Sequence, residues 1–199
     1  MNRRHRISGA VAALAVAAGL GLASAPAAVS HAYIGGSGSQ LTARAAMPGN
    51  TGLGAVQYEP QSIEGPKGFP AAGPADGMLA SGGNTRFSEL DQQSSTRWVK
   101  NQVTTDSVTV AWKYSALHAT TKWEYYITKQ GWNQNAPLSR SSLELIETVP
   151  YNGTLPVQGQ THTIDIPADR SGYHVIYAVW VVDNTANAFY NAIDVNIQR

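Results

Sequence analysis

The chain has 199 residues, of which 43% are hydrophobic, and its 14 basic and 13 acidic residues give a formal net charge of +1 at pH 7. It contains no cysteine, which excludes disulfides, thiolate metal sites and cysteine nucleophiles. It also lacks the basic surplus with which proteins neutralise phosphates, so a nucleic-acid partner is not expected.

Residues 1–30 have the pattern of a secretory signal peptide, namely a basic start, an apolar run over 10–22 and small residues ending in Ala28-Val29-Ser30. We expect cleavage after Ser30 and secretion of a chain with 11 basic and 13 acidic residues. The apolar run is shorter than the ~20 residues of a membrane span, which argues against an uncleaved anchor. The pair Arg3-Arg4 leaves the export route open between the general secretory and twin-arginine pathways.

Cleavage there makes His31 the first residue of the mature protein. A histidine at a free N-terminus offers a metal two nitrogens, the α-amine and a ring nitrogen, and a third nitrogen would complete a T-shaped site suited to copper. The remaining histidines are His118, His162 and His174, and none lies in the H-E-x-x-H pattern of zinc proteases. A single histidine just past a predicted strand, as His118 is, more often has a structural role, so these residues alone leave the third ligand open.

The mature chain, 31–199, is predicted to be one all-β domain. Alternating or apolar runs predict strands at 31–34, 108–112, 161–166, 173–182 and 192–197. Short strands separated by turn residues are typical of a β-sandwich. The segment 35–93 is rich in Gly, Pro, Ala and Ser, a composition also found in disordered chains. We expect it to pack, because it carries Tyr58, Ile63, Phe69, Leu79 and Phe87.

Side-chain alternation divides the strand at 173–182 into two faces. His174, Ile176, Ala178 and Trp180 share one face, whereas Tyr173, Val175, Tyr177 and Val179 share the other. This placement predicts His174 to be a core histidine with satisfied hydrogen bonds rather than a ligand. We expect His162 to be a strand residue without a metal role.

Seven motifs in chain order resemble the bacterial lytic polysaccharide monooxygenases of auxiliary activity family 10, formerly described as chitin-binding proteins. They cover essentially the whole mature chain: His31-Ala32-Tyr33, Gln57-Tyr58-Glu59-Pro60-Gln61-Ser62-Ile63-Glu64-Gly65, Thr96-Arg97-Trp98, Ala116-Leu117-His118-Ala119-Thr120-Thr121-Lys122-Trp123, Tyr126-Ile127-Thr128-Lys129, Pro167-Ala168-Asp169-Arg170-Ser171-Gly172-Tyr173-His174-Val175-Ile176 and Asn187-Ala188-Phe189-Tyr190.

The resemblance implies a fibronectin-III/immunoglobulin-like β-sandwich with a long, partly helical loop region after the first strand. It also implies a histidine brace holding one copper ion, with the amine and Nδ1 of His31 and Nε2 of His118 as ligands. An external electron donor would reduce the copper, and O2 or H2O2 would be the co-substrate. The implied reaction is C1-oxidising cleavage of crystalline chitin.

Further roles follow from the resemblance position by position. Phe189 matches the aromatic beside the axial copper position, and Ala116 matches the small residue that shapes access to it. Glu64 matches the acid that positions oxygen species near copper. Trp180 matches a tryptophan beneath the copper site that is a candidate route for electrons.

The expected partner is a flat chitin surface, met by a monomeric protein with no membrane contact after cleavage. Tyr58 is expected to stack on a sugar, and five polar residues to hydrogen-bond it: Glu59, Gln61, Asn184, Thr185 and Asn187. Relatives often read Asp-Thr-x-Asn-Ala-Phe, whereas this chain has Asn184 in the first position and Asp183 displaced by one residue. This departure concerns substrate affinity and the choice of chitin polymorph rather than the copper site.

Three alternatives stay open. A non-catalytic chitin-binding module would not require His31, His118 and Glu64 together. A hydrolase would need paired carboxylates across a sugar-binding pocket, with Glu59 and Glu64 as the nearest candidates. The third alternative is the same oxidative chemistry on cellulose, which the chitin-type motifs Tyr58-Glu59-Pro60 and Ala188-Phe189 disfavour.

Overall fold

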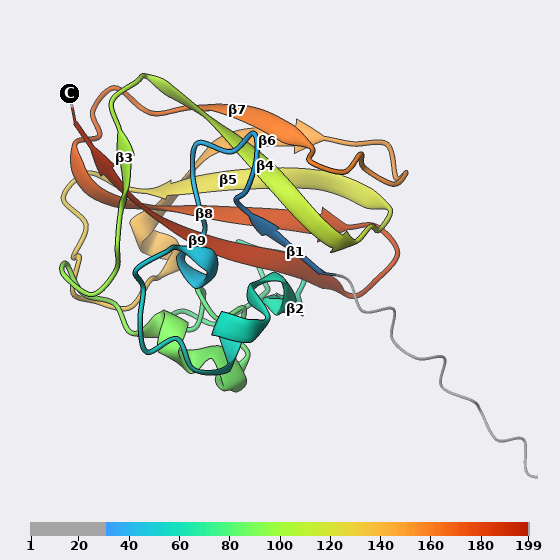
Figure 1. Ribbon diagram of the computed structural model, residues 1–199, viewed down its shortest axis with the longest axis horizontal. Helices are drawn as coiled ribbons and strands as arrows, with labels where there is room; N and C mark the ends of the chain where they lie inside the picture. The colour runs from blue at the N-terminus through green and yellow to red at the C-terminus, as the bar shows by residue number, and fades with distance from the viewer. Residues whose placement is uncertain (1–30, 199) are drawn as a thin grey trace, which may run out of the picture.

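Two β-sheets dominate the computed structural model, which describes residues 31–198 (Figure 1). The predicted signal peptide falls on residues 1–30 and lies outside the described residues. The strands are β1 (His31–Ile34), β2 (Glu64–Pro66), β3 (Asn101–Val103), β4 (Ser107–Ala116), β5 (Thr120–Thr128), β6 (Leu143–Pro150), β7 (Thr161–Asp165), β8 (Gly172–Val182) and β9 (Asn187–Ile197). Short 3-10 helices lie at η1 (Arg44–Ala46), η2 (Gly54–Tyr58), η3 (Pro60–Ser62), η4 (Thr85–Asp91) and η5 (Arg140–Ser142).

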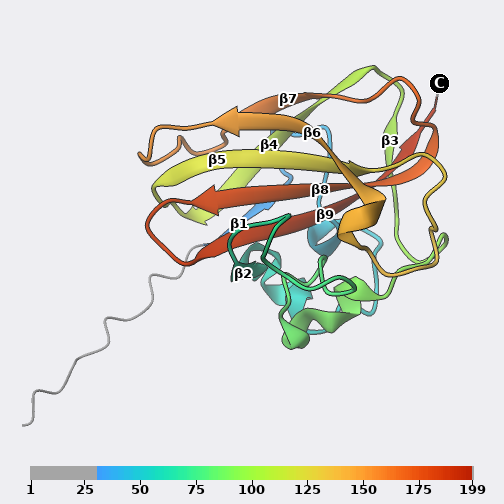
Figure 2. The ribbon, with the colours of Figure 1, turned by 180° about the vertical axis from the view of Figure 1, so that it is seen from behind.

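The sheets form the expected sandwich. The smaller sheet has the order β1-β4-β7, and the larger has the order β2-β9-β8-β5-β6, with β3 pairing parallel to the far end of β9. Figure 2 shows β6, β5, β8 and β9 side by side. One hydrophobic core lies between the sheets, and Ile176, Ala178 and Trp180 of β8 belong to it. The prediction of an all-β sandwich is therefore confirmed.

A second core covers the opposite face of the larger sheet. Val175, Tyr177 and Val179 of β8 pack there against apolar residues of the segment 35–93, among them Phe69 and Leu79. The 3-10 helices η1 to η4 of this segment gather on that side of the sheet (Figures 1 and 2). The segment is thus packed and partly helical as predicted, and the two predicted faces of β8 are both buried in separate cores.

Four of the observed strands were not predicted from the sequence, namely β2, β3, β5 and β6. Residues 123–128 of β5 are all buried, because the strand lies inside the larger sheet with a core on each face, so the alternation that marks a strand is absent. The last strand begins at Asn187 rather than at residue 192. Its polar Asn191 is buried, and the side-chain Oδ1 accepts a hydrogen bond from the backbone N–H of Ile34 at 3.1 Å.

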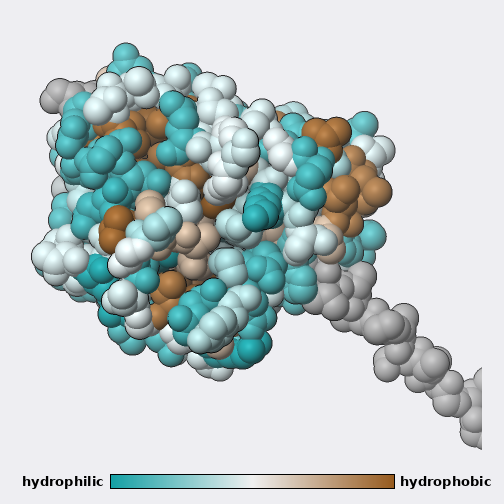
Figure 3. Space-filling model, viewed as in Figure 1, coloured by the Kyte–Doolittle hydropathy of each residue, from teal (hydrophilic) through white to brown (hydrophobic). Residues whose placement is uncertain are grey.

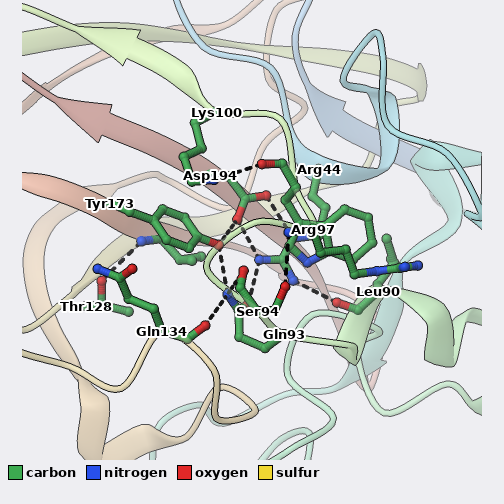
Figure 4. A network of polar contacts seen from close by, with 12 residues as sticks. Arg44, Leu90, Gln93, Ser94, Arg97, Lys100, Thr128, Gln134, Tyr173 and Asp194 are labelled. Carbon is green, nitrogen blue, oxygen red and sulfur yellow. Dashed lines mark hydrogen bonds and ion pairs between the residues drawn. The ribbon is translucent and has the colours of Figure 1, made fainter.

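A buried ion pair ties the loop segment to β9 (Figure 4). Arg44 of η1 donates to both carboxylate oxygens of Asp194, with Nε–Oδ2 2.9 Å and Nη2–Oδ1 2.7 Å, and both side chains are at most 1% exposed. Arg44 Nη1 also donates to the carbonyl of Leu90 at 2.7 Å, and the Tyr173 hydroxyl donates to Asp194 Oδ1 at 2.7 Å. Every oxygen of the buried carboxylate is therefore paired, as a buried charge requires.

Candidate metal centre

Pairing between β1 and β4 brings His31 to the end of the smaller sheet. His31 lies opposite Ala116, and the register shifts between His31 and Ala32. Since β4 ends at Ala116, His118 follows two residues later in the turn to β5. The chain therefore places His31, Ala116 and His118 together, although 84 residues separate the first two along the sequence.

The His118 side chain is nearly buried, at 8% exposure, and its ring nitrogens differ in their surroundings. Nδ1 lies 3.5 Å from the amide oxygen Oδ1 of Asn184, a long contact that favours a proton on Nδ1. Nε2 would then carry the lone pair. Neutral imidazole nitrogen is a ligand that suits copper, so this arrangement fits the donor that the resemblance assigns to His118. Asn184 thus contacts His118, in addition to the substrate role expected of it.

Glu64 and Phe189 are held together by the pairing of β2 with β9, where they are direct cross-strand partners. The next residue, Gly65, has no side chain, which lets the backbone of Gly82 pack against β2, because a Cβ at Gly65 would lie 2.0 Å from the carbonyl oxygen of Gly82. Phe189 is fully buried and Glu64 is half-buried. η3, which immediately precedes β2, contacts β1, so this pair and His31 come from neighbouring elements.

Trp180 connects the two halves of the site. Its ring centroid lies 5.0 Å from that of Phe189, its cross-strand partner. Its Nε1–H donates to the hydroxyl oxygen of Thr120 at 2.8 Å, and that hydroxyl donates to the carbonyl of His118 at 3.0 Å. Trp180 is therefore both a core residue and a support for the His118 turn. This role of Thr120 was not predicted, since no local sequence pattern connects Thr120 with Trp180, 60 residues away in β8.

The residues expected to touch substrate lie on two exposed segments. Tyr58, at the end of η2, is 83% exposed. Gln61 in η3, the β8–β9 turn residues Asn184 and Thr185, and Asn187 at the start of β9 are exposed or half-buried. Figure 3 shows that hydrophilic residues cover most of the face in view and that hydrophobic residues form small separate patches.

Besides Asn184, two of the residues expected to touch substrate, Thr185 and Glu59, have side-chain partners within the chain. The Thr185 hydroxyl accepts from the backbone N–H of Asn187 at 3.2 Å and donates to its carbonyl at 3.1 Å. The Glu59 carboxylate pairs with Arg86 at 2.5 Å. The displaced Asp183 lies at the base of the β8–β9 turn, where Oδ1 accepts from the Thr121 hydroxyl at 3.1 Å. The Asp183 carboxylate therefore stabilises the β8–β9 turn. The residue beside His118 is the uncharged amide Asn184.

The other two histidines occupy the core. His174 has Nδ1 at 3.0 Å from both the hydroxyl and the carbonyl of Thr128, and Nε2 at 3.1 Å from Gln130 Oε1, so the prediction of satisfied hydrogen bonds is confirmed. His162 lies in β7, as predicted, with Nδ1 2.5 Å from the Tyr125 hydroxyl. Within residues 31–198, no three His, Cys, Asp or Glu side chains gather into a metal-binding group. Nor does this range contain a helix long and apolar enough to cross a membrane.

Stability should fall in mild acid because of His162. Burial lowers the pKa of His162 from 6.5 to about 4, and burial also lowers the pKa of His174. As the pH falls from about 6.5 to 4, His162 becomes protonated in the unfolded chain but stays neutral in the folded chain. The free energy of unfolding therefore decreases over this pH range. Urea unfolding followed by tryptophan fluorescence measures this slope. His162→Phe should flatten it, and identical slopes for the variant and the original protein would contradict the assignment.

Comparison with known proteins finds one matching family and several similar chains. The sequence model of a family described as "Lytic polysaccharide mono-oxygenase, cellulose-degrading" matches residues 22–195. A lytic chitin monooxygenase of Enterococcus faecalis is 45% identical over 170 residues, covering 84% of this chain and 86% of that protein. A GlcNAc-binding protein A of Shewanella oneidensis is 51% identical over 149 residues, covering 74% of this chain. This chain spans only 31% of the length of that protein.

Solved structures share the fold. The catalytic domain of a lytic polysaccharide monooxygenase from Listeria monocytogenes superposes with a TM-score of 0.80 at 46% identity, covering 85% of this chain and all of that one. A Bacillus amyloliquefaciens protein of carbohydrate-binding module family 33, solved in complex with Cu(I), has a TM-score of 0.75 at 46% identity. It covers 84% of this chain and is itself covered completely.

Proposed function

We propose that this chain, which belongs to the lytic polysaccharide mono-oxygenase family, cleaves the β-1,4-glycosidic bonds of crystalline chitin by oxidation at C1. The observation that carries the proposal is the β1–β4 pairing, which sets His31 beside Ala116 and the His118 turn. Chitin as the substrate is supported by the names of two relatives, a lytic chitin monooxygenase at 45% identity and a GlcNAc-binding protein A at 51% identity, because chitin is a polymer of GlcNAc.

His31 and His118 would hold one copper ion. Cleavage after Ser30 would free the α-amine of His31, which would bind together with its Nδ1, while His118 would contribute Nε2. The contact between His118 Nδ1 and Asn184 supports this assignment, because it leaves Nε2 free. A relative's structure with Cu(I) supports the choice of metal. When bound, copper would supply the one-electron chemistry that activates O2 or H2O2 against a strong C–H bond, after reduction by an external donor.

The chain's own residues would position the reactants. Glu64, half-buried beside Phe189, would hydrogen-bond and orient the oxygen co-substrate. Phe189 and Trp180 present apolar ring surface that would keep water from one side of the centre. Ala116, opposite His31, has no side chain beyond Cβ and would leave room for the co-substrate to enter.

The polysaccharide would lie across exposed residues rather than in a cleft. Tyr58 offers its exposed ring to a sugar face, and Gln61, Asn184 and Asn187 offer hydrogen-bonding groups. Thr185 and Glu59 would contribute less than predicted, because their polar groups already have partners. A secreted, monomeric enzyme would fit such an insoluble substrate, with residues 1–30 as the removed signal.

The direct test mixes the mature, copper-loaded protein with β-chitin and ascorbate and analyses the soluble products by mass spectrometry. We expect chito-oligosaccharides ending in aldonic acids, only in the presence of reductant. His118→Ala should abolish these products, because the metal loses a ligand, while His174→Gln is a control that alters a histidine away from the centre. Oxidised products from His118→Ala would show that His118 is not a ligand.

Cellulose is the second candidate substrate, because the matching family is described as cellulose-degrading. The same assay on cellulose would give aldonic cello-oligosaccharides if this candidate is correct. Binding to chitin without any oxidised product from either polysaccharide would instead support a non-catalytic binding module. Unoxidised oligosaccharides formed without reductant would indicate a hydrolase.

A further inference from the structure

Two exposed aliphatic side chains lie on the segment 151–160, which connects β6 to β7. Leu155 is 59% exposed and Val157 is 65% exposed, and we call these two residues the apolar pair. Pro156, between them, is buried, so the segment is anchored to the protein while both aliphatic side chains face solvent. The proposed function gives neither of them a role.

Hydrogen bonds hold this segment against the His118 turn. The backbone N–H of Thr120 donates to the carbonyl of Thr154 at 2.9 Å, and the N–H of Gly153 donates to the carbonyl of Thr120 at 3.0 Å. Thr120 is also the residue whose hydroxyl donates to the carbonyl of His118. Figures 1 and 2 both show the segment 151–160 at the same end of the sandwich as the β8–β9 turn. The apolar pair therefore lies beside the proposed metal centre.

The conformation of the segment is fixed on both sides of the apolar pair. Before it, Asn152 Oδ1 accepts from the N–H and the hydroxyl of Thr154, at 3.2 Å and 2.6 Å. After it, the Gln158 side chain accepts from the N–H of Tyr114 at 3.0 Å and donates to the carbonyl of Tyr114 at 2.8 Å, as a neighbouring strand would. A surface that is already ordered loses little conformational entropy when it binds a partner.

The composition of the segment fits a neutral partner. Residues 151–160 contain no charged side chain, so a partner that is recognised through ion pairs is not favoured. Figure 3 shows hydrophobic atoms gathered at the right-hand end of the molecule. Chitin is a neutral polymer in which each sugar carries an acetamido group that ends in a methyl group. Contact between this methyl group and an aliphatic side chain removes apolar surface of both partners from water.

We propose that the apolar pair extends the chitin-binding surface beyond the His118 turn and contacts the acetamido methyl groups of the polymer. The inference rests on the proposed function and deepens it, because cellulose has a hydroxyl group in place of the acetamido group. Tyr58 comes from the segment that covers one face of the larger sheet, whereas the segment of the apolar pair is bonded to β4 of the smaller sheet. The polymer is thus held on both sides of the proposed metal centre.

Binding of the metal-free protein to β-chitin tests the proposal without any catalysis. The double variant Leu155→Asn/Val157→Thr nearly keeps the size of both side chains and replaces apolar groups by polar ones. It should raise the dissociation constant at least about fivefold, because two aliphatic contacts with the polymer are lost. Thermal unfolding of the variant checks that it is folded, as expected for changes at two exposed residues.

The matched control is Leu145→Asn/Val99→Thr, which makes the same chemical changes at two other exposed residues. Leu145 pairs with Tyr126, towards the end of β5 that is distant from the His118 turn, and Val99 precedes β3, which pairs with the far end of β9. This control should bind β-chitin with the dissociation constant of the original protein.

A second comparison tests the contact with the methyl group itself. Chitosan that has been N-acetylated and chitosan that has been N-formylated to the same degree differ by one methyl group on each modified sugar. The original protein and the control should bind the N-acetylated polymer more tightly, and the double variant should lose most of this preference. An equal preference in the original protein and the double variant, or none in the original protein, would overturn the proposed contact.

The outcomes separate this inference from the proposed function. If the double variant binds β-chitin as tightly as the original protein, and the original protein still releases aldonic acids, only the inference is wrong. If the original protein neither binds nor oxidises β-chitin, the proposed function is wrong and the inference is wrong with it. A dimer in sedimentation experiments that becomes a monomer in the double variant would show that the apolar pair contacts a second copy of the chain, which would also overturn the inference.

Discussion

One extra residue in front of His31 should abolish tight copper binding. The α-amine of His31 would become a peptide nitrogen, which is no longer a basic donor, and the site would keep only imidazole ligands. Loss of even a group that supports a metal ligand costs up to about 100-fold in affinity, so loss of a ligand should exceed about 100-fold. Calorimetric titration of Cu(II) into the mature chain and into the extended chain measures the difference directly.

The control for this experiment is the thermal unfolding of both chains without metal. His31 is only half-buried and begins β1, so an added residue should leave the melting temperature of the metal-free protein nearly unchanged. Equal copper affinity of the two chains would rule out the brace while leaving the family assignment intact. The chitin assay would then have to be explained by another metal arrangement.

The sequence predicted the sandwich because strand alternation is a local signal, whereas the site residues were predicted only from the resemblance and stay a prediction. Alternation in 173–182 predicts the two buried faces of β8, and both are found. The residues alone, however, left His118 as an ordinary turn histidine. Only the resemblance gave it a partner, since the pairing of His31 with Ala116 joins residues that no local pattern connects.

What the sequence could not show are contacts between side chains from distant strands. Thr120 supports both His118 and Trp180, yet an isolated threonine after a histidine has no distinctive pattern. His162 was expected to be a plain strand residue, and its strand placement is correct. Its partnership with Tyr125 depends on β5, a strand that was missed because both of its faces are buried.

The largest loss of stability should come from Asp194→Ala. This substitution leaves the guanidinium of Arg44 buried at 1% exposure without its carboxylate, and removing one member of a buried ion pair costs about 3–5 kcal/mol. Chemical denaturation of the metal-free protein measures the change in the free energy of unfolding. Arg86→Ala is the matched control, because Arg86 also pairs with a carboxylate, Glu59, but is 62% exposed, and its loss should cost less than about 1 kcal/mol.

The double variant Arg44→Met/Asp194→Leu separates the cost of an orphaned charge from the value of the ion pair. Removing both charges leaves no buried ion, so this variant should be more stable than Asp194→Ala. Some loss should remain, because Arg44 also binds the Leu90 carbonyl and packs on the Trp98 ring at 4.6 Å, and Tyr173 donates to Asp194. If Asp194→Ala costs no more than Arg86→Ala, the packed segment 35–93 is held to β9 by its apolar core alone.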